Sequence, residues 1–123
     1  MNLTFEELQA INKRRCESTF HSVEEWKPWE WSNAMAGECG EACNITKKMN
    51  RIWPANQFIQ NWNKPEDQRM AELEDRLADE LADVVIYADL LATRIGRSLG
   101  ECVRKKFNEK SDEIHSTIKL PED

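Results

Sequence analysis

Two pairs of acidic residues, each with its members three positions apart, most constrain how this chain can fold. Glu38 and Glu41 form the first pair, and Glu80 and Asp83 form the second. Residues three apart on an α-helix lie on one face, with Cβ atoms roughly 5–6 Å apart. Small or apolar residues surround both pairs. The pattern therefore predicts two helices packed face to face, with four carboxylates directed into one pocket.

Such a pocket needs compensation for its charge, because buried unpaired carboxylates are very unfavourable. Ligands that are all oxygen favour Mg²⁺ or Mn²⁺. We therefore predict a metal site, with a structural network of ion pairs as the alternative. A di-iron bundle would need Glu-x-x-His on two helices, and neither His21 nor His115 follows a glutamate by three positions. Gly37 and Gly40 each cost a helix about 1 kcal/mol relative to alanine, which suggests that another backbone or a ligand comes close.

The spacing of the apolar residues is helical throughout and predicts an all-α fold. Thr4 with Glu7, and Ser98 with Glu101, have the spacing of helix caps. The expected helices span residues 4–16, 29–51 and 65–95 and a fourth stretch from residue 98. The expected connections are a turn or short helix at 18–28, a loop at 54–65 with a helical turn at 56–61, and a flexible tail at 116–123. The third helix has the clearest apolar stripe, which predicts its buried face: Leu73, Leu77, Leu81, Val84, Val85, Ala88, Leu91 and Ile95.

Length and charge limit the classes of protein that the chain can belong to. Its 123 residues predict a single domain over 1–123. A net charge of −6 makes it a poor binder of nucleic-acid polymers and anionic membranes. The sequence has neither an apolar run of roughly 20 residues nor the order of a signal peptide, so a cytoplasmic location is expected. Cys39 and Cys43 do not form a Cys-x-x-Cys unit and are expected to pack between helices.

Three short blocks follow one another in a fixed order: Gly-Glu-Cys-Gly-Glu at 37–41, Asp-Glu-Leu-Ala-Asp-Val-Val-Ile-Tyr at 79–87, and Lys-Phe-Asn-Glu-Lys-Ser at 106–111. Together they resemble the MazG-like, all-α nucleoside triphosphate pyrophosphatases, which include dCTP pyrophosphatases and dimeric dUTPases. The resemblance covers about residues 26–111. Two positions differ from relatives: many relatives have a further acid where Asn44 stands, and some have an asparagine where Lys110 stands.

The resemblance implies an antiparallel four-helix core and a homo-oligomer, either a dimer or a tetramer, with sites near the subunit interfaces. It also implies Mg²⁺, for which Mn²⁺ can substitute, held by Glu38, Glu41, Glu80 and Asp83. The implied reaction cleaves a nucleoside triphosphate between its α- and β-phosphates, giving a monophosphate and pyrophosphate. Metal-assisted attack by water suits these residues. Of the two catalytic glutamates, Glu38 and Glu41, we prefer Glu41 as the general base.

Other side chains are needed to bind the rest of the nucleotide. Lys48 and Lys106 are predicted phosphate ligands, with solvated surface lysines as the alternative. The segment before the acidic helix contributes base contacts in relatives, so Trp26 and Trp31 are predicted to stack on the base, with core packing as the alternative. Tyr87 is predicted to contact the sugar and to favour a deoxyribose.

Asn108 is a predicted contact to phosphate, sugar or base. The alternative to an enzyme is a non-catalytic helical module that binds nucleotides or a protein partner through its tryptophans. The presence of all four acids favours the enzyme.

Overall fold

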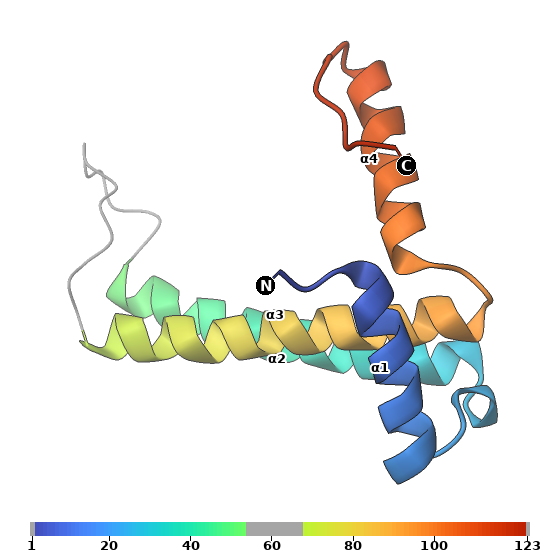
Figure 1. Cartoon of the computed structure of the whole chain (residues 1–123). Helices are drawn as coiled ribbons and strands as arrows, with labels where there is room; N and C mark the ends of the chain where they lie inside the picture. Colours follow the sequence, from blue (N-terminus) through green and yellow to red (C-terminus); the bar gives the residue numbers. More distant parts are fainter. Residues whose placement is uncertain (1, 54–67, 123) are drawn as a thin grey trace. The chain divides into compact units, whose positions relative to one another are not determined.

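The structure is a computed structural model that describes residues 2–53 and 68–122. This part of the chain contains four α-helices and one short 3₁₀ helix, which confirms the all-α prediction. In chain order they are α1 (Phe5–Thr19), η1 (Val23–Glu25), α2 (Pro28–Ile52), α3 (Gln68–Arg94) and α4 (Leu99–Glu113) (Figure 1). The predicted helical turn at 56–61 and the predicted start of the third helix at residue 65 lie outside the described residues.

The helix starts follow the capping signals in the sequence. Thr4 Oγ1 accepts a hydrogen bond from the Glu7 N–H at 3.1 Å, and the Glu7 carboxylate accepts one from the Thr4 N–H at 3.0 Å. This reciprocal pair is the predicted capping box of α1. The Ser98 hydroxyl accepts from the Glu101 N–H at the start of α4. Ser22 caps η1 in the same way, so the segment before α2 contains the short helix that the sequence allowed.

The chain divides into two compact units. Unit 1 comprises Met1–Ser32 and Ile86–Asp123, and unit 2 comprises Asn33–Val85. Both α2 and α3 contribute residues to each unit. None of the helices within residues 2–53 and 68–122 is long and apolar enough to cross a membrane.

The core of unit 1 forms where α1 and η1 meet the first turn of α2 and the last turns of α3. Its buried members are Cys16, Val23, Trp31 and Leu90. A polar contact ties α1 to α3 beside this core. The Asn12 side-chain amide donates to the Ile86 carbonyl at 3.0 Å and to the Asp89 carboxylate at 2.9 Å. Asn12 and Asp89 are both buried, so this contact joins two helices inside the core.

Asp89 makes the stability of the protein depend on pH. Burial raises the pKa of its carboxyl, and the hydrogen bond from Asn12 opposes the shift. Because the folded pKa lies above the unfolded value of about 3.9, the contribution of Asp89 to the free energy of unfolding is highest below that value and falls as pH rises through the folded pKa. We therefore expect Asp89→Asn to raise Tm at neutral pH, with the gap closing in acid. Thermal melts across pH test this, with exposed Asp75→Asn as control; a gap independent of pH would contradict it.

The start of α4 packs closely on the start of α1. A Cβ atom added at Gly100 would lie 2.8 Å from the Cβ of Phe5. Neither atom is the end of a flexible side chain, so the two helices would have to separate. We expect Gly100→Ala to destabilise the protein by about 1–3 kcal/mol, although alanine is the better helix former.

Gly40→Ala is the matched control, because a Cβ there meets nothing within 4 Å in the described chain. It should stabilise α2 by about 1 kcal/mol. Urea unfolding of both variants measures the two effects. If Gly100→Ala were also stabilising, that result would contradict the close packing of α4 on α1 at Gly100 and Phe5.

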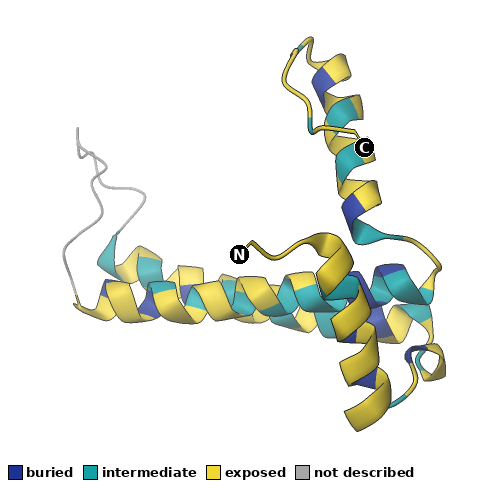
Figure 2. Cartoon of the chain, in the orientation of Figure 1, coloured by how far each residue is buried: buried dark blue, intermediate teal, exposed yellow. Residues whose placement is uncertain are grey.

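Unit 2 consists of the remaining lengths of α2 and α3, which lie side by side and run in opposite directions (Figure 1). Ile45 from α2 and Met70 and Leu73 from α3 are buried there. The predicted apolar stripe of α3 is only partly buried. Leu81 is 55% exposed and Val85 is 43% exposed, and exposed residues recur along α3 (Figure 2). Ile95, just after α3 in unit 1, is also exposed. The prediction that the whole stripe is core is therefore wrong for these three residues.

One face of α2 in unit 2 is also uncovered. Cys39 and Cys43, which were expected to pack between helices, are exposed. A Cβ atom added at Gly37 or Gly40 would have no heavy atom of the described chain within 4 Å. The close approach that these glycines predict is therefore not made within the described chain, and a ligand or another subunit remains as the alternative neighbour.

The end of the chain folds back along α4 in unit 1, where the sequence predicted a flexible tail. His115 has a φ of 60° at the turn. The Asn108 side chain donates to the Leu120 carbonyl at 3.0 Å and accepts from the Leu120 N–H at 2.8 Å. Arg104 Nε donates to the Pro121 carbonyl at 2.7 Å.

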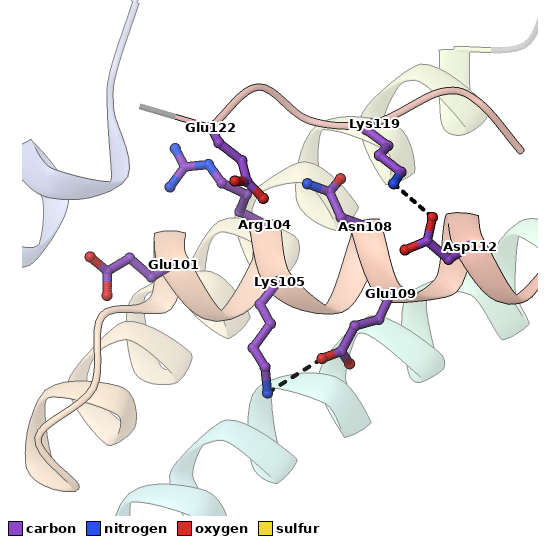
Figure 3. A pocket seen from close by; sticks show the side chains of 8 residues that line it. All are labelled: Glu101, Arg104, Lys105, Asn108, Glu109, Asp112, Lys119 and Glu122. Carbon is purple, nitrogen blue, oxygen red and sulfur yellow. Dashed lines mark ion pairs between the residues drawn. The ribbon is translucent and has the colours of Figure 1, made fainter.

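A cavity of about 520 Å³ lies beside this segment. The Lys119 ammonium forms an ion pair of 2.6 Å with Asp112 across it (Figure 3). Its lining residues, from α4 and the returning segment, are Glu101, Arg104, Lys105, Asn108, Glu109, Asp112, Lys119 and Glu122.

Candidate functional site

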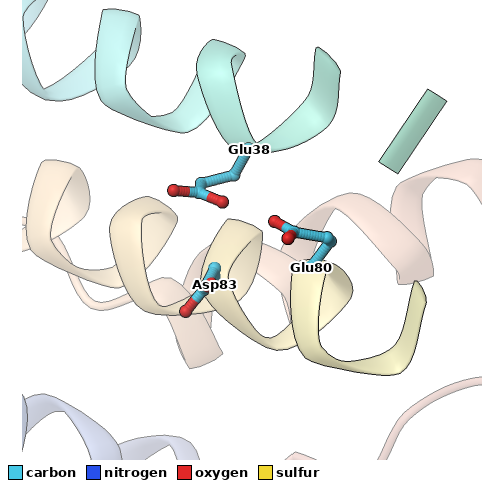
Figure 4. Close-up of side chains that lie close together, drawn as sticks. All are labelled: Glu38, Glu80 and Asp83. Carbon is cyan, nitrogen blue, oxygen red and sulfur yellow. The ribbon is translucent and has the colours of Figure 1, made fainter. Parts of the chain in front are cut away.

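Three of the four predicted metal ligands converge in unit 2. Glu38 extends from α2 towards α3, where Glu80 and Asp83 lie one turn apart (Figure 4). One oxygen atom from each carboxylate lies within 4.8 Å of the other two. All three side chains are partly buried. The i, i+3 spacing on α3 and the antiparallel pairing with α2 therefore bring together three of the four carboxylates that the sequence predicted to converge.

The proximity of another carboxyl group raises the pKa of one member of the cluster, Glu80. The carboxyl group of Glu38 raises the pKa of Glu80, chiefly because a protonated Glu80 can donate a hydrogen bond to it. Burial raises it further, as do the negative charges of Glu38 and Asp79, while the positive charge of Arg76 opposes them. Glu80 Oε2 is enclosed and has no hydrogen-bond donor among the described residues. Among the described residues, the positive charge of Arg76 does not offset the upward shift in the pKa of Glu80.

A hard cation fits this arrangement. Mg²⁺ binds oxygen at about 2.0–2.1 Å, so ligand oxygens on opposite sides of the ion are roughly 4.2 Å apart. One oxygen of each carboxylate lies within 4.8 Å of the other two, which is close to this spacing. A cation would also satisfy the orphaned Glu80 oxygen and remove the repulsion between the carboxylates. The all-oxygen donor set favours Mg²⁺ or Mn²⁺ over softer metals.

The other two candidates in unit 2 do not join the cluster. Glu41 is exposed and is not among the three residues whose oxygens converge. Lys48 is exposed further along α2. The roles predicted for both remain predictions.

Two of the predicted base contacts and the predicted sugar contact meet in unit 1. The ring centroids of Trp26 and Trp31 are 4.6 Å apart, and those of Trp31 and Tyr87 are 6.3 Å apart. His21 and Phe20 join the same aromatic cluster, at 4.7 Å and 5.3 Å from the Trp26 ring. The cluster gathers residues from the α1–α2 connection, the start of α2 and the end of α3.

The two tryptophans differ in what they can contact. Trp31 is 0% exposed, and its indole N–H donates to the Val23 carbonyl at 3.1 Å. In this conformation it has no free face for a base. Trp26 is partly buried and leans on Trp31. Stacking of a base on Trp26 therefore remains a prediction. Stacking on Trp31 would require the surrounding aromatic rings to move apart.

The two candidates on α4 differ as well. Lys106 is exposed. Asn108 is partly buried, and both ends of its side-chain amide are bonded to Leu120. A contact between Asn108 and a nucleotide would have to replace or extend these bonds, and its predicted role remains a prediction.

Sequence reasoning missed three residues that organise unit 1. Arg94 donates from Nε to the Trp26 carbonyl at 2.7 Å and pairs with Glu24 at 3.2 Å. No local pattern could reveal this, because the partners lie 68 residues apart in the sequence. The sequence could have indicated that Asp89 is buried, since Asp89, like Glu80, stands among apolar residues. His21 was considered only as an iron ligand, although it lies close to the tryptophans in the sequence.

The fold and the site together define an all-helical protein with a carboxylate cluster suited to a divalent cation. The sequence profile of the MazG-like family matches residues 56–119, just over half of the chain. The chain therefore belongs to the MazG-like family, as the sequence blocks indicated. The matched segment includes Glu80 and Asp83 but not Glu38, so the structure supplies the third member of the cluster. No curated protein and no solved structure matches the chain.

Proposed function

We propose that this protein is a Mg²⁺-dependent nucleoside triphosphate pyrophosphohydrolase, which cleaves between the α- and β-phosphates. The observation that carries the proposal is the convergence of Glu38, Glu80 and Asp83 from two helices, with an orphaned oxygen on Glu80. Membership of the MazG-like family supports a fold of the nucleoside triphosphate pyrophosphatase type. The three members cannot form ion pairs with one another, because all three are acidic.

Within this proposal the carboxylates of Glu38, Glu80 and Asp83 hold the cation. When bound, Mg²⁺ would neutralise phosphate charge and lower the pKa of a water molecule. Glu41 lies one turn after Glu38 and is exposed to solvent, so its carboxylate is free to approach the attacking water as the general base. The acids of the cluster cannot bind the phosphates directly, since carboxylates and phosphates are both negatively charged. The acids are therefore proposed to hold the cation, and the lysines to bind the phosphates.

The rest of the nucleotide requires cations and an aromatic surface. Lys48 and Lys106 are exposed and are the proposed phosphate ligands. Trp26 is the proposed stacking partner of the base, supported from behind by the enclosed Trp31. Tyr87 packs against this cluster and is the proposed sugar contact, which would favour a deoxynucleotide.

A panel of ribo- and deoxynucleoside triphosphates, incubated with Mg²⁺, tests the function. We expect equal amounts of monophosphate and pyrophosphate, and no reaction in excess chelator. Release of orthophosphate would indicate cleavage at the γ-phosphate and would contradict the proposal. Nucleotide binding without turnover would favour the non-catalytic helical module instead.

We also propose that the protein is a homo-oligomer. Four apolar residues at i, i+3, i+4 and i+7 form an exposed stripe on α3: Ala78, Leu81, Ala82 and Val85. A stripe with this spacing is the usual packing face of a helix. A second copy of the chain is the proposed partner, since the exposed apolar stripes on α3 of the two copies can cover each other.

Light scattering tests this assembly. We expect at least a dimer, and we expect Val85→Lys to shift the mass to the monomer, because a charge would be buried without a partner. The control is Ile11→Lys, at an exposed position on α1. A concentration-independent monomer mass for the active wild-type protein would overturn the prediction.

A further inference from the structure

Three polar residues on one face of α4 hold the segment of residues 116–122, here called the returning segment. Arg104, Asn108 and Asp112 follow one another at intervals of four residues, so their side chains form a row along the helix (Figure 3). Residues 119–121 bind this row in reverse order, through hydrogen bonds and an ion pair of 2.6 to 3.0 Å. The row is therefore a binding surface for three consecutive residues of a chain that runs antiparallel to α4.

Backbone groups of the returning segment make most of these contacts. The Leu120 N–H, the Leu120 carbonyl and the Pro121 carbonyl each bond to a side chain of α4. The apolar side chain of Ile118, by contrast, stays 72% exposed, and the buried core of unit 1 does not include the returning segment. Polar contacts with one helix therefore hold the segment, and the same contacts can form when that helix belongs to a second copy of the chain.

The turn that brings the segment back along α4 is strained. The Ser116 N–H donates to the Ser111 carbonyl at 2.8 Å, and His115 within this turn has a φ of 60°. Helix ends of this kind usually place glycine in the left-handed conformation, which is unfavourable for a residue with a Cβ atom. Residues 114–118 are the whole link between α4 and the first contact at Lys119. Short links under strain favour exchange of the element that they carry.

A second copy of α4 has a surface on which to pack. Val103, Phe107 and Ile114 lie on one face of the helix, away from the row, and are 38%, 45% and 60% exposed. Two copies of this apolar face can cover each other. The helices must meet near their last turns, because residues 114–118 span at most roughly 17 Å when extended. Phe107 and Ile114 lie in or next to this half of α4.

We propose that the returning segment exchanges between two copies of the chain, so that residues 119–121 of each copy bind Arg104, Asn108 and Asp112 of the other. The arrangement is self-complementary, since each copy contributes one segment and one row. The hydrogen bonds and the ion pair are the same as in the closed form described above, while His115 is released from its left-handed conformation. This exchange depends neither on nucleotide hydrolysis nor on the exposed stripe of α3.

Carbodiimide cross-linking tests the exchange without any substitution, because it joins a lysine amine to a carboxylate in direct contact with it. Unlabelled copies and copies labelled with ¹⁵N are mixed in urea, refolded together and cross-linked, and the joined peptides are identified by mass spectrometry. We expect Lys119–Asp112 cross-links between unlabelled and labelled copies to be as abundant as the two single-isotope forms taken together. The matched control is the Lys105–Glu109 ion pair within α4, whose cross-links should all be of a single isotope.

Two substitutions at His115 should change the exchange in opposite directions. His115→Gly makes the left-handed turn favourable, so it should lower the share of mixed-isotope cross-links. His115→Val should raise that share, because a β-branched residue strongly disfavours the conformation. His115 is exposed, so neither substitution removes a buried side chain.

The outcomes decide between the exchanged and the closed form. Lys119–Asp112 cross-links that are all of a single isotope, like those of the control pair, would overturn the proposal. Absence of this cross-link would overturn it as well, since both forms contain the ion pair. Equal mixed-isotope shares in His115→Gly and His115→Val would show that the turn does not drive exchange, contrary to the proposal.

Coexpression gives the same answer if the protein does not refold from urea. One copy carries Asp112→Asn and the other carries Lys119→Arg, so neither copy can form the Lys119–Asp112 cross-link by itself. Its detection in the coexpressed pair would require exchange. A pair that gives the Lys105–Glu109 cross-link but no Lys119–Asp112 cross-link would contradict the proposal.

Discussion

Glu38→Gln and Asp83→Asn should each lower nucleotide hydrolysis by about a thousandfold or more. A catalytic cation supplies several kcal/mol of transition-state stabilisation, and each tenfold in rate corresponds to about 1.4 kcal/mol. Both substitutions keep the shape of the side chain but remove a charged ligand from the cluster. Steady-state assays with saturating nucleotide and increasing Mg²⁺ measure the loss and show whether excess metal recovers it.

The fold should survive these changes. In the metal-free protein Glu38→Gln removes one of the carboxylates that repel each other, so its Tm should not fall below that of the wild type. Added Mg²⁺ should raise the Tm of the wild type, because a ligand that binds only the folded state stabilises it, and this increase should be smaller in both variants.

Glu72→Gln and Asp75→Asn are the matched controls. They form another acidic pair at i, i+3 on α3, and both side chains are exposed. They should leave the activity and the response to Mg²⁺ unchanged. Near-normal turnover of Glu38→Gln and Asp83→Asn would show that the carboxylate cluster is not the metal site.

Trp31→Ala should destabilise the protein by about 3–5 kcal/mol, the usual cost of emptying the site of a fully buried aromatic side chain. Trp31 fills the centre of unit 1 and satisfies the Val23 carbonyl through its indole N–H, and both contributions are lost together. Chemical unfolding followed by circular dichroism measures the effect.

Trp26→Ala should behave differently, because Trp26 is only partly buried. We expect KM for the preferred nucleotide to rise more than kcat falls, with a loss of about 1–3 kcal/mol in binding. The contact is present in both the ground state and the transition state, which is why KM carries the change. Trp26→Phe keeps a ring and should restore much of the affinity.

Measurement of Tm and KM on the same variants separates packing from recognition. A large fall in Tm with unchanged KM in the folded fraction would assign both tryptophans to the core. Tyr87 and Asn108 would then be the remaining predicted contacts for the sugar and base.

The local parts of this fold were predictable because they depend on neighbours in the sequence. The caps formed by Thr4 with Glu7 and by Ser98 with Glu101 satisfy backbone groups three residues away. The pairing of Glu80 with Asp83 follows from helix geometry alone. The carboxylate cluster depended on one further assumption, that the two helices that carry these acids pack face to face.

The contacts that organise unit 1 were not predictable in the same way. Asn12 and Asp89 are 77 positions apart, and Arg94 binds a carbonyl 68 positions away. The sequence shows that each of these residues is polar but not which polar group it meets. The full burial of Trp31 beside the partly buried Trp26 is also a tertiary outcome, because the sequence does not show how far each tryptophan is enclosed.

The sequence by itself determined the helices, their caps and the residues able to form an acidic metal site, because periodicity and short-range hydrogen bonds act within one or two turns. Only the tertiary structure decided that Glu38, Glu80 and Asp83 converge while Glu41 stays exposed, and that Asn108 binds the returning end of the chain. It also decided that the apolar stripe of α3 is left partly uncovered. The physical reason is that periodicity defines a helix face, whereas its partner depends on long-range packing.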